Sequence, residues 1–133
     1  MPYLNVRISM NESSEIAEKI VTVLMSHTNT VLGKKPEVTS IDIEFVSPDK
    51  WFVGGTRVSE QNSVTFYLDI KITEGTNTKS EKAKYVQEVF KDIESIVGSI
   101  TPASYIVIHD VRADSWGFQG RTQESRFIQT QSL

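Results

Sequence analysis

The sequence predicts an α/β protein of the α+β kind, in which two tandem βαβ units share one four-stranded mixed sheet with both helices on one face. Three observations support this prediction. The order strand, helix, strand occurs twice along the 133 residues. Identical residues recur in the two halves at a nearly constant offset. The length suits one compact domain and is short for two.

The first unit is expected to span about residues 2–55. Apolar and polar side chains alternate over residues 3–8, which predicts a strand with one buried face. Apolar residues then recur at helical spacing up to Gly33, which suits the end of a helix. Alternation resumes in VTSIDIEFV at 38–46, and the Ser-Pro and Gly-Gly pairs of SPDKWFVGG at 47–55 predict a turn-rich segment.

The second unit is expected to span about residues 66–120, followed by a C-terminal tail at 121–133. VTFYLDIKI and ASYIVIHDV read as strands on either side of a helix at residues 78–98. The apolar side chains of that helix form the stripe expected to face the core, namely Val86, Val89, Phe90, Ile93 and Val97.

The repetition extends to residue types that chance seldom aligns. At an offset of 65 residues, Gly, Asp and Trp positions coincide as well as apolar ones, in the pairs Val21/Val86, Gly33/Gly98, Ile41/Ile106, Ile43/Ile108, Val46/Val111, Asp49/Asp114, Trp51/Trp116 and Gly55/Gly120. Right-handed crossovers then pair the two strands of each unit in parallel and place both helices on one face.

The second face of the predicted sheet has nothing in this chain to cover it. It would display a mixture of aromatic, polar and charged side chains, namely Tyr3, Asn5, Arg7, Tyr67, Asp69 and Lys71. Parallel strands are seldom left open to water on one face. Self-association that covers this face is therefore expected.

Composition excludes several classes of function. The net charge of −3 and the isoelectric point near 5.4 give no general attraction to nucleic acid or to anionic membranes. The absence of cysteine excludes disulfides, thiolate metal sites and thiol nucleophiles. Two histidines far apart in sequence are a poor basis for a metal site, and we expect no cofactor. No signal peptide or membrane-spanning run is recognised, so we expect a cytoplasmic protein.

Pro2, directly after the initiator methionine, permits two interpretations. Proline is tolerated as the first residue of a strand because no ladder donor is needed there. Alternatively, removal of Met1 leaves a secondary amine, which burial can make a general base near neutral pH.

Three features together resemble the tautomerase superfamily: an N-terminal proline heading a βαβ unit, WFVGG at 51–55, and a duplicated unit that includes ADSWGFQGR at 113–121. The chain is similar to the double-length, 4-oxalocrotonate tautomerase-like members, including malonate semialdehyde decarboxylase, cis-3-chloroacrylic acid dehalogenase and macrophage migration inhibitory factor. The resemblance implies a homotrimer and an isomerase without a cofactor. Pro2 would be the general base and acid acting on a small enol or 2-hydroxydienoate carboxylate.

Two alternatives remain open. The same proline serves decarboxylases, hydratases or dehalogenases of three-carbon acids, where Asp114 or His109 would be the second acid, base or water-orienting group. A non-catalytic trimeric binding protein of this fold is the other alternative. His109 and Asp114 also have purely structural interpretations, as a satisfied strand-end histidine and a turn aspartate, and His27 is expected to be buried structure.

The resemblance implies an arginine that binds the substrate carboxylate, and this arginine is missing from the sequence. Thr76 follows the Glu-Gly pair where the arginine is expected, and Asp42 stands where a second one would be. A carboxylate substrate still needs a cation. The candidates for substrate binding are four cations and two pocket aromatics, namely Arg7, Lys71, Arg57, Arg121, Trp51 and Trp116, although each also has a structural interpretation.

Overall fold

The computed structural model describes residues 2–131 and contains one four-stranded mixed sheet. Its strands are β1 (Tyr3–Ile8), β2 (Ser40–Phe45), β5 (Phe66–Thr73) and β6 (Tyr105–Val111), in the spatial order β2-β1-β5-β6. Within each unit the strands are parallel, and the units meet through the antiparallel pair of β1 and β5. The predicted fold class is confirmed.

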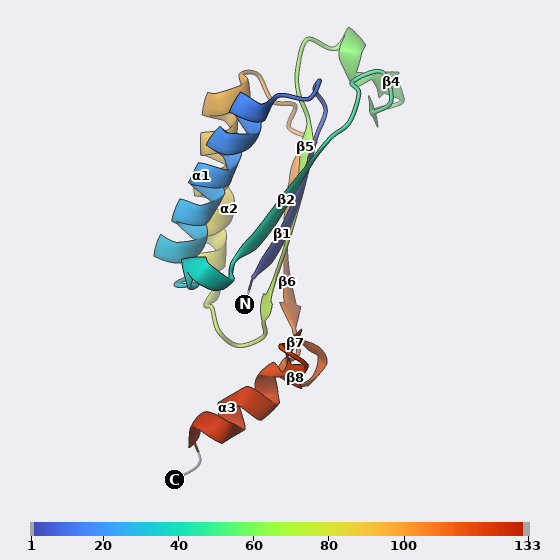
Figure 1. Ribbon diagram of the computed structural model, residues 1–133. Coiled ribbons are helices and arrows are strands. Elements are labelled where there is room, and N and C mark those ends of the chain that lie inside the picture. The colour runs from blue at the N-terminus through green and yellow to red at the C-terminus, as the bar shows by residue number, and fades with distance from the viewer. Residues whose placement is uncertain (1, 132–133) are drawn as a thin grey trace.

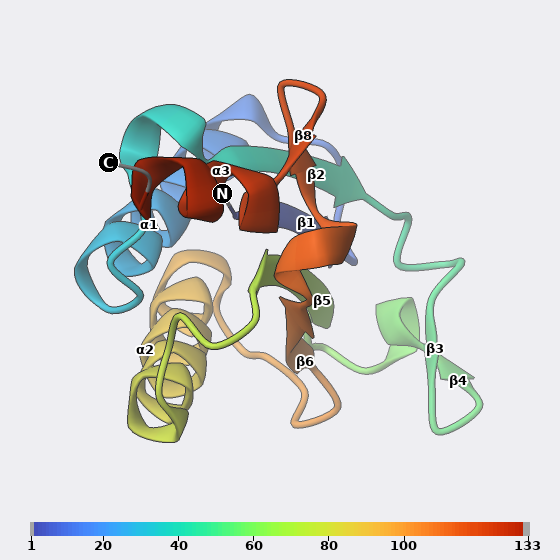
Figure 2. The same cartoon turned by 90° about the horizontal axis from the view of Figure 1, so that it is seen from below.

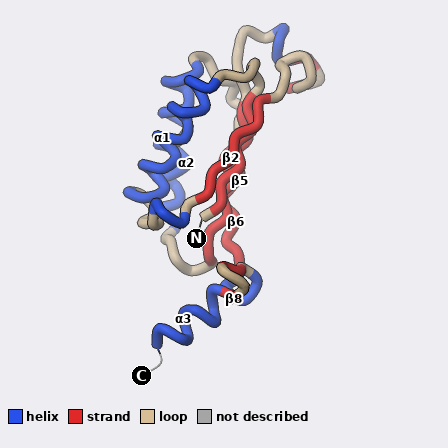
Figure 3. Tube along the Cα trace, in the orientation of Figure 1, coloured by secondary structure: helices blue, strands red, loops and turns tan. Residues whose placement is uncertain are grey.

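Two long helices cover one face of the sheet, as Figure 1 shows. They are α1 (Ser14–Thr30), which begins at a cap by the Ser13 side chain, and α2 (Lys79–Val97), which begins with a reciprocal capping box between Thr78 and Glu81. Figure 3 shows the opposite face of the sheet without a helix over it. The uncovered face expected from the sequence is therefore present in the single chain.

The core lies between the helices and the sheet. Alternate residues of the central strands are fully buried, namely Leu4, Val6, Ile8, Phe66, Leu68, Ile70 and Ile72. The prediction for α2 is wrong at Val86, which is 37% exposed. Tyr85, Val89 and Ile93 form the buried row instead, because the helix turns the side of Tyr85 toward the sheet.

Tyr85 is expected to make the fold less stable at alkaline pH. Its side chain is fully buried and its hydroxyl lies 3.1 Å from Thr28 Oγ1. Burial raises the pKa of Tyr85 from 10.0 to about 12, while the contact with Thr28 opposes this shift. The folded chain therefore keeps this proton at a pH where the unfolded chain has lost it, so stability is intact below pH 10 and falls as pH rises toward 12.

We expect the free energy of unfolding to fall by roughly 2–3 kcal/mol from this one group between pH 10 and pH 12. Urea unfolding of the wild type and of Tyr85→Phe at several pH values measures it, because the phenylalanine variant has no group to titrate. Parallel losses of stability in the two proteins over this pH range would contradict the prediction.

A short hairpin follows the last strand of each unit. In the first unit it pairs β3 (Phe52–Val53) with β4 (Thr56–Arg57), and in the second it pairs β7 (Gly117–Phe118) with β8 (Arg121–Thr122). The two hairpins also have an equivalent backbone hydrogen bond. The carbonyl of Trp51 accepts from Val58 N at 2.9 Å, and that of Trp116 accepts from Gln123 N at 2.8 Å.

The units diverge after these hairpins. The first continues into a short 3-10 turn at Val58–Glu60, whereas the second continues into helix α3 (Gln123–Gln131). The segment expected as a tail from residue 121 therefore begins inside the second hairpin. Figure 2 shows α3 crossing the end of the sheet at which the chain begins. Within residues 2–131, no helix combines the length and apolar character needed to cross a bilayer.

Candidate active site

Pro2 is buried at the end of the sheet, immediately before β1. Its carbonyl accepts a hydrogen bond from Ser40 N at 3.2 Å, which fixes it beside the start of β2. The next residue, Tyr3, pairs with Lys71 near the end of β5. By strand alternation Pro2 belongs with Leu4, on the side of the sheet that faces the helices. The proline therefore sits between the sheet end and the helix layer.

Segments of both units lie at the end of the sheet where Pro2 is found. Since β5 is antiparallel to β1 and parallel to β6, the ends of β5 and β6 lie on the same side as the start of β1. Glu74 N donates to the carbonyl of Val111 at 2.8 Å, which holds the two strand ends together. The 3-10 turn Ala113–Ser115 and α3 follow directly.

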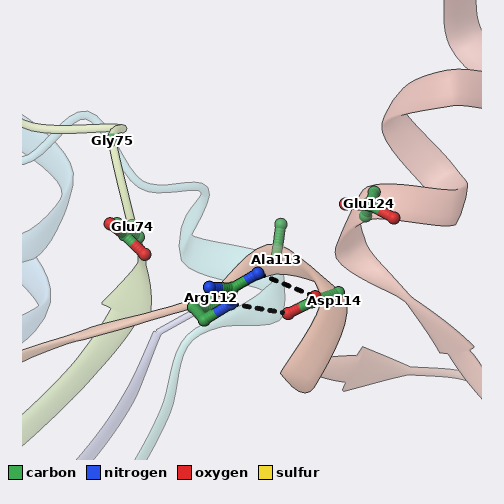
Figure 4. Close-up of a pocket in the computed structure, with 6 residues that line it drawn as sticks. All are labelled: Glu74, Gly75, Arg112, Ala113, Asp114 and Glu124. Carbon is green, nitrogen blue, oxygen red and sulfur yellow. Dashed lines mark hydrogen bonds and ion pairs between the residues drawn. The ribbon is translucent and has the colours of Figure 1, made fainter.

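A first hollow of about 440 Å³ lies between the end of β5, the turn after β6 and α3 (Figure 4). It is lined by Glu74, Gly75, Arg112, Ala113, Asp114 and Glu124. Arg112 Nε and Nη2 each donate to an oxygen of Asp114 at 3.2 Å. Because three carboxylates face this one guanidinium, and Asp114 already holds it, the hollow is poorly suited to an anion.

Arg112 sets the protonation of Asp114. Hydrogen bonds from Arg112, and secondarily from Ser115, lower the pKa of the Asp114 carboxyl below its ordinary value. The carboxylate is thus stabilised in its charged form, which is the wrong direction for a general acid at neutral pH.

We expect Arg112→Gln to raise the pKa of Asp114 toward that of an ordinary aspartate, because the group with the largest effect is removed. A pH titration of the Asp114 carboxyl carbon by NMR measures this change. Lys91→Gln, at an exposed position on α2, is the control and should leave the titration unchanged. The assignment of Arg112 as the cause would be wrong if the Asp114 titration curves of wild type and Arg112→Gln coincided.

His109 and Pro2 lie on opposite faces of the sheet within one chain. His109 Nε2 is 2.6 Å from Asp69 Oδ1 on the uncovered face, where His109 pairs in register with Lys71. The histidine expected from the sequence as a second acid or base is thus engaged by a neighbouring strand. His27 is half-buried and contacts Asp92 between the two long helices, in keeping with a structural role.

The two cations predicted on the sheet, Arg7 and Lys71, have partners on its uncovered face. Arg7 Nε lies 3.5 Å from Glu44 Oε2, and Lys71 Nζ lies 5.6 Å from the centre of the Tyr3 ring. The Tyr3 hydroxyl donates to Asp42 at 2.5 Å, and this bond is the main cause that raises the pKa of Tyr3. These cations lie on the opposite face from Pro2.

The two cations predicted on the hairpins also have local partners. Arg57 lies over the Phe52 ring at 5.4 Å and donates to the carbonyl of Asp49. Arg121 donates to Ser125 Oγ at 3.0 Å and contacts Gln129 in the following helix. Neither guanidinium lines the three hollows at the end of the sheet where Pro2 lies.

The two tryptophans are placed at opposite ends of the sheet. Trp51 lines a hollow of about 300 Å³ at the end remote from Pro2. The other lining residues come from the first hairpin and the uncovered face, namely Phe52, Val53, Gly54, Tyr67, Ala103 and Tyr105. Trp116 is half-buried beside the second hairpin, near the end where Pro2 lies.

A second hollow at this end of the sheet, of about 350 Å³, lies between the α1–β2 connection and α3. It has three cations and one acid in its lining, which consists of Gly33, Lys34, Lys35, Glu37, Val38, Gln123 and Arg126. Lys34 Nζ donates to Thr76 Oγ1 at 2.8 Å, and burial lowers the pKa of Lys34. Sequence reasoning missed this group, because the position of α3 brings it together.

Comparison with known proteins gives a family match and a fold match. No curated protein matches the chain in a sequence comparison. The model of the family described as Tautomerase enzyme matches residues 67–126. Among solved structures, a fused 4-OT determined as an asymmetric trimer is 16% identical, with a TM-score of 0.83 over 94% of this chain and 98% of that one.

The macrophage migration inhibitory factor homologue from Prochlorococcus marinus is 22% identical, with a TM-score of 0.73 over 90% of this chain and 97% of that one. The macrophage migration inhibitory factor-like protein from Entamoeba histolytica is 20% identical, with a TM-score of 0.74 over 91% and 97%. The Tautomerase enzyme model thus matches most of the second unit, and the fused 4-OT structures share the fold of nearly the whole chain.

Proposed function

We propose that this protein is a cofactor-independent tautomerase in which the amine of Pro2, freed by removal of Met1, transfers a proton within a small enol or 2-hydroxydienoate carboxylate. The observation that supports this most is the placement of Pro2. It is buried at the sheet end where segments of both units meet, and other segments at this end line hollows of about 440 and 350 Å³.

Burial gives the proposed amine a suitable pKa. An α-amine in water has a pKa of about 7.7–8.0, and burial disfavours its charged form, so the pKa of the Pro2 amine falls toward neutrality. In the reaction the amine accepts the hydroxyl proton of the enol. The carbonyl then forms as the C=C electron pair takes a proton from the prolinium at carbon, so no redox partner or cofactor is needed.

The contacts of two residues favour tautomerisation over the decarboxylase, hydratase or dehalogenase alternative. That alternative assigns Asp114 and Arg121 to water activation and substrate binding. Asp114 is held by Arg112, and Arg121 is held by Ser125 in α3. A single proton-transferring amine needs neither residue.

We also propose that the chain forms a homotrimer through the uncovered sheet face. Tyr105, 55% exposed, lies there beside Tyr67 with ring centres 6.1 Å apart, so aromatic surface is left in contact with water. The fused 4-OT structures with the same fold were determined as trimers. The hollow lined by Trp51 opens on this face and would then meet a neighbouring subunit.

The proposed activity is tested with phenylenolpyruvate as the probe, in D₂O. Loss of the enol absorbance together with one deuterium at C3 of the phenylpyruvate product, seen by NMR, is the expected result. Release of carbon dioxide, or no acceleration over buffer, would overturn the assignment as a tautomerase. Mass spectrometry of the same sample determines whether Met1 has been removed.

A further inference from the structure

We propose that α3 of one copy docks into the aromatic hollow at the first hairpin of a second copy, so that copies of this chain associate head to tail. The two surfaces lie at opposite ends of the sheet, as Figure 1 shows for α3 and for β4 of the hairpin. The inference does not depend on the proposed reaction, and it specifies which ends of neighbouring copies meet in the homotrimer proposed above. Two features support it: exposed apolar side chains at both ends, and unpaired charges of opposite sign beside them.

The first surface lies on α3, which extends beyond the end of the sheet in Figures 1 and 3. Its main contacts within residues 2–131 are with the 3-10 turn after β6 and with β8. Phe127 and Ile128 are 64% and 60% exposed, more than any other large apolar side chain in the described part of the chain. Glu124 lies three residues before Phe127 and four before Ile128, which places the three side chains on one side of the helix. This α3 surface is therefore an apolar pair with an acid beside it.

The second surface is the hollow of about 300 Å³ between the first hairpin and the uncovered face of the sheet. Four aromatic side chains contribute to its lining, namely Trp51, Phe52, Tyr67 and Tyr105. Phe52 and Tyr105 are each more than half exposed. Four of the five exposed large apolar side chains within residues 2–131 thus belong to the two surfaces, and the fifth lies on α2. An aromatic hollow is suited to receive the ring of Phe127, because the contact removes apolar area of both surfaces from water.

The charges beside the two surfaces have opposite signs. The Arg57 guanidinium lies 5.4 Å from the centre of the Phe52 ring and donates to the carbonyl of Asp49. It forms no ion pair within the described residues. At the other end, Glu74 and Glu124 line a hollow of about 600 Å³, and over the same residues neither of them forms an ion pair. Electrostatic complementarity therefore favours contact between the unlike ends of two copies over contact between like ends.

A contact between unlike surfaces at opposite ends of the chain is heterologous. Each copy then uses both ends: its α3 enters the hollow of one neighbour, and its own hollow receives α3 of another. Such contacts form a ring when the rotation between copies closes, and a ring of three agrees with the proposed homotrimer. The second unit alone continues into a helix of this length, whereas the first continues into the 3-10 turn Val58–Glu60. The head-to-tail arrangement follows from this difference between the units.

Sedimentation equilibrium over a range of protein concentrations tests the contact, because it measures both the mass of the assembly and the concentration at which it dissociates. We expect the wild type to reach the mass of three chains. Phe127→Ser should raise the concentration at which half of the trimer dissociates by about tenfold or more, since it removes the ring that enters the hollow. Val86→Ser is the matched control, because Val86 is an exposed apolar residue of α2 outside both surfaces. It should assemble like the wild type.

A charge exchange tests whether the contact joins two copies. Arg57→Glu and Glu124→Arg should each weaken assembly by about tenfold or more, since each places like charges opposite one another. The double variant restores opposite charges and should assemble within about threefold of the wild type. Because β4 and α3 lie at opposite ends of one chain, such recovery requires a contact between copies. Lys84→Glu, a charge reversal at an exposed position of α2, should have no effect.

Wild-type assembly of Phe127→Ser and of both single charge variants would overturn the head-to-tail contact and leave the homotrimer in place. Failure of the double variant to recover would also overturn the contact. A wild type that sediments as a single chain at every concentration would overturn both. Circular dichroism and thermal unfolding of each variant separate loss of assembly from misfolding. A failure of the proposed reaction remains distinguishable, because sedimentation requires no substrate.

Discussion

Replacing Pro2 with alanine is expected to lower kcat for the ketonisation of phenylenolpyruvate by about 10²- to 10⁴-fold, the usual contribution of a general acid or base. Alanine keeps an α-amine but loses the ring that fixes the nitrogen at the head of β1. Since Pro2 is not assigned to carboxylate binding, KM should change much less than kcat.

Pro102→Ala is the matched control, because this proline lies exposed in the connection before β6. It should retain wild-type kcat and KM. Steady-state kinetics of the three proteins, after mass spectrometry has shown the same N-terminal processing, provide the comparison. If Pro2→Ala had the kcat of the wild type, the base would have to be sought elsewhere.

The second large effect concerns Phe66, which aligns with Pro2 at the offset of 64 residues that also aligns Leu4 of β1 with Leu68 of β5. Phe66 is fully buried, with its ring centre 5.8 Å from that of Phe90. Phe66→Ala removes a large side chain from the centre of the core, so we expect the free energy of unfolding to fall by about 3–5 kcal/mol. That is a large part of the total stability of a domain of this size.

Urea unfolding monitored by circular dichroism measures this loss, with Phe52→Ala as the control. Phe52 is 52% exposed and its ring lies under the Arg57 guanidinium, so its removal should cost no more than about 1 kcal/mol. Similar losses in the two variants would contradict the assignment of Phe66 to the core. The two equivalent positions thus differ in role: one supports the fold, and the other carries the nitrogen assigned to the reaction.

The fold was largely predictable because its determinants are periodic and local. Alternation in the strands places Leu68 and Ile70 in the core, and the Gly-Gly turn at 54–55 matches the observed hairpin. The prediction failed at Val86 because α2 has more apolar residues than positions that can face the sheet. Tertiary packing decides which of them are buried, and it buries Tyr85.

The candidate site was predictable only in part. Pro2 is marked by its position in the sequence, and register places it at the sheet end. Lys34 and Gln123 belong to no local pattern. They meet because α3 crosses beneath the sheet, and neither repetition nor periodicity predicts that crossing. The Lys34 ammonium nevertheless donates to Thr76, where the sequence had indicated a missing cation.

The role of the Pro2 nitrogen is tested most directly by two chains that differ only in whether Met1 is present. Cleavage of an N-terminal fusion yields a chain that begins at Pro2, and a second preparation retains Met1, which makes the Pro2 nitrogen an amide that cannot titrate. We predict that the chain beginning at Pro2 ketonises phenylenolpyruvate at least about 10²-fold faster, with the same unfolding midpoint for both. Equal rates in the two chains would contradict catalysis by Pro2.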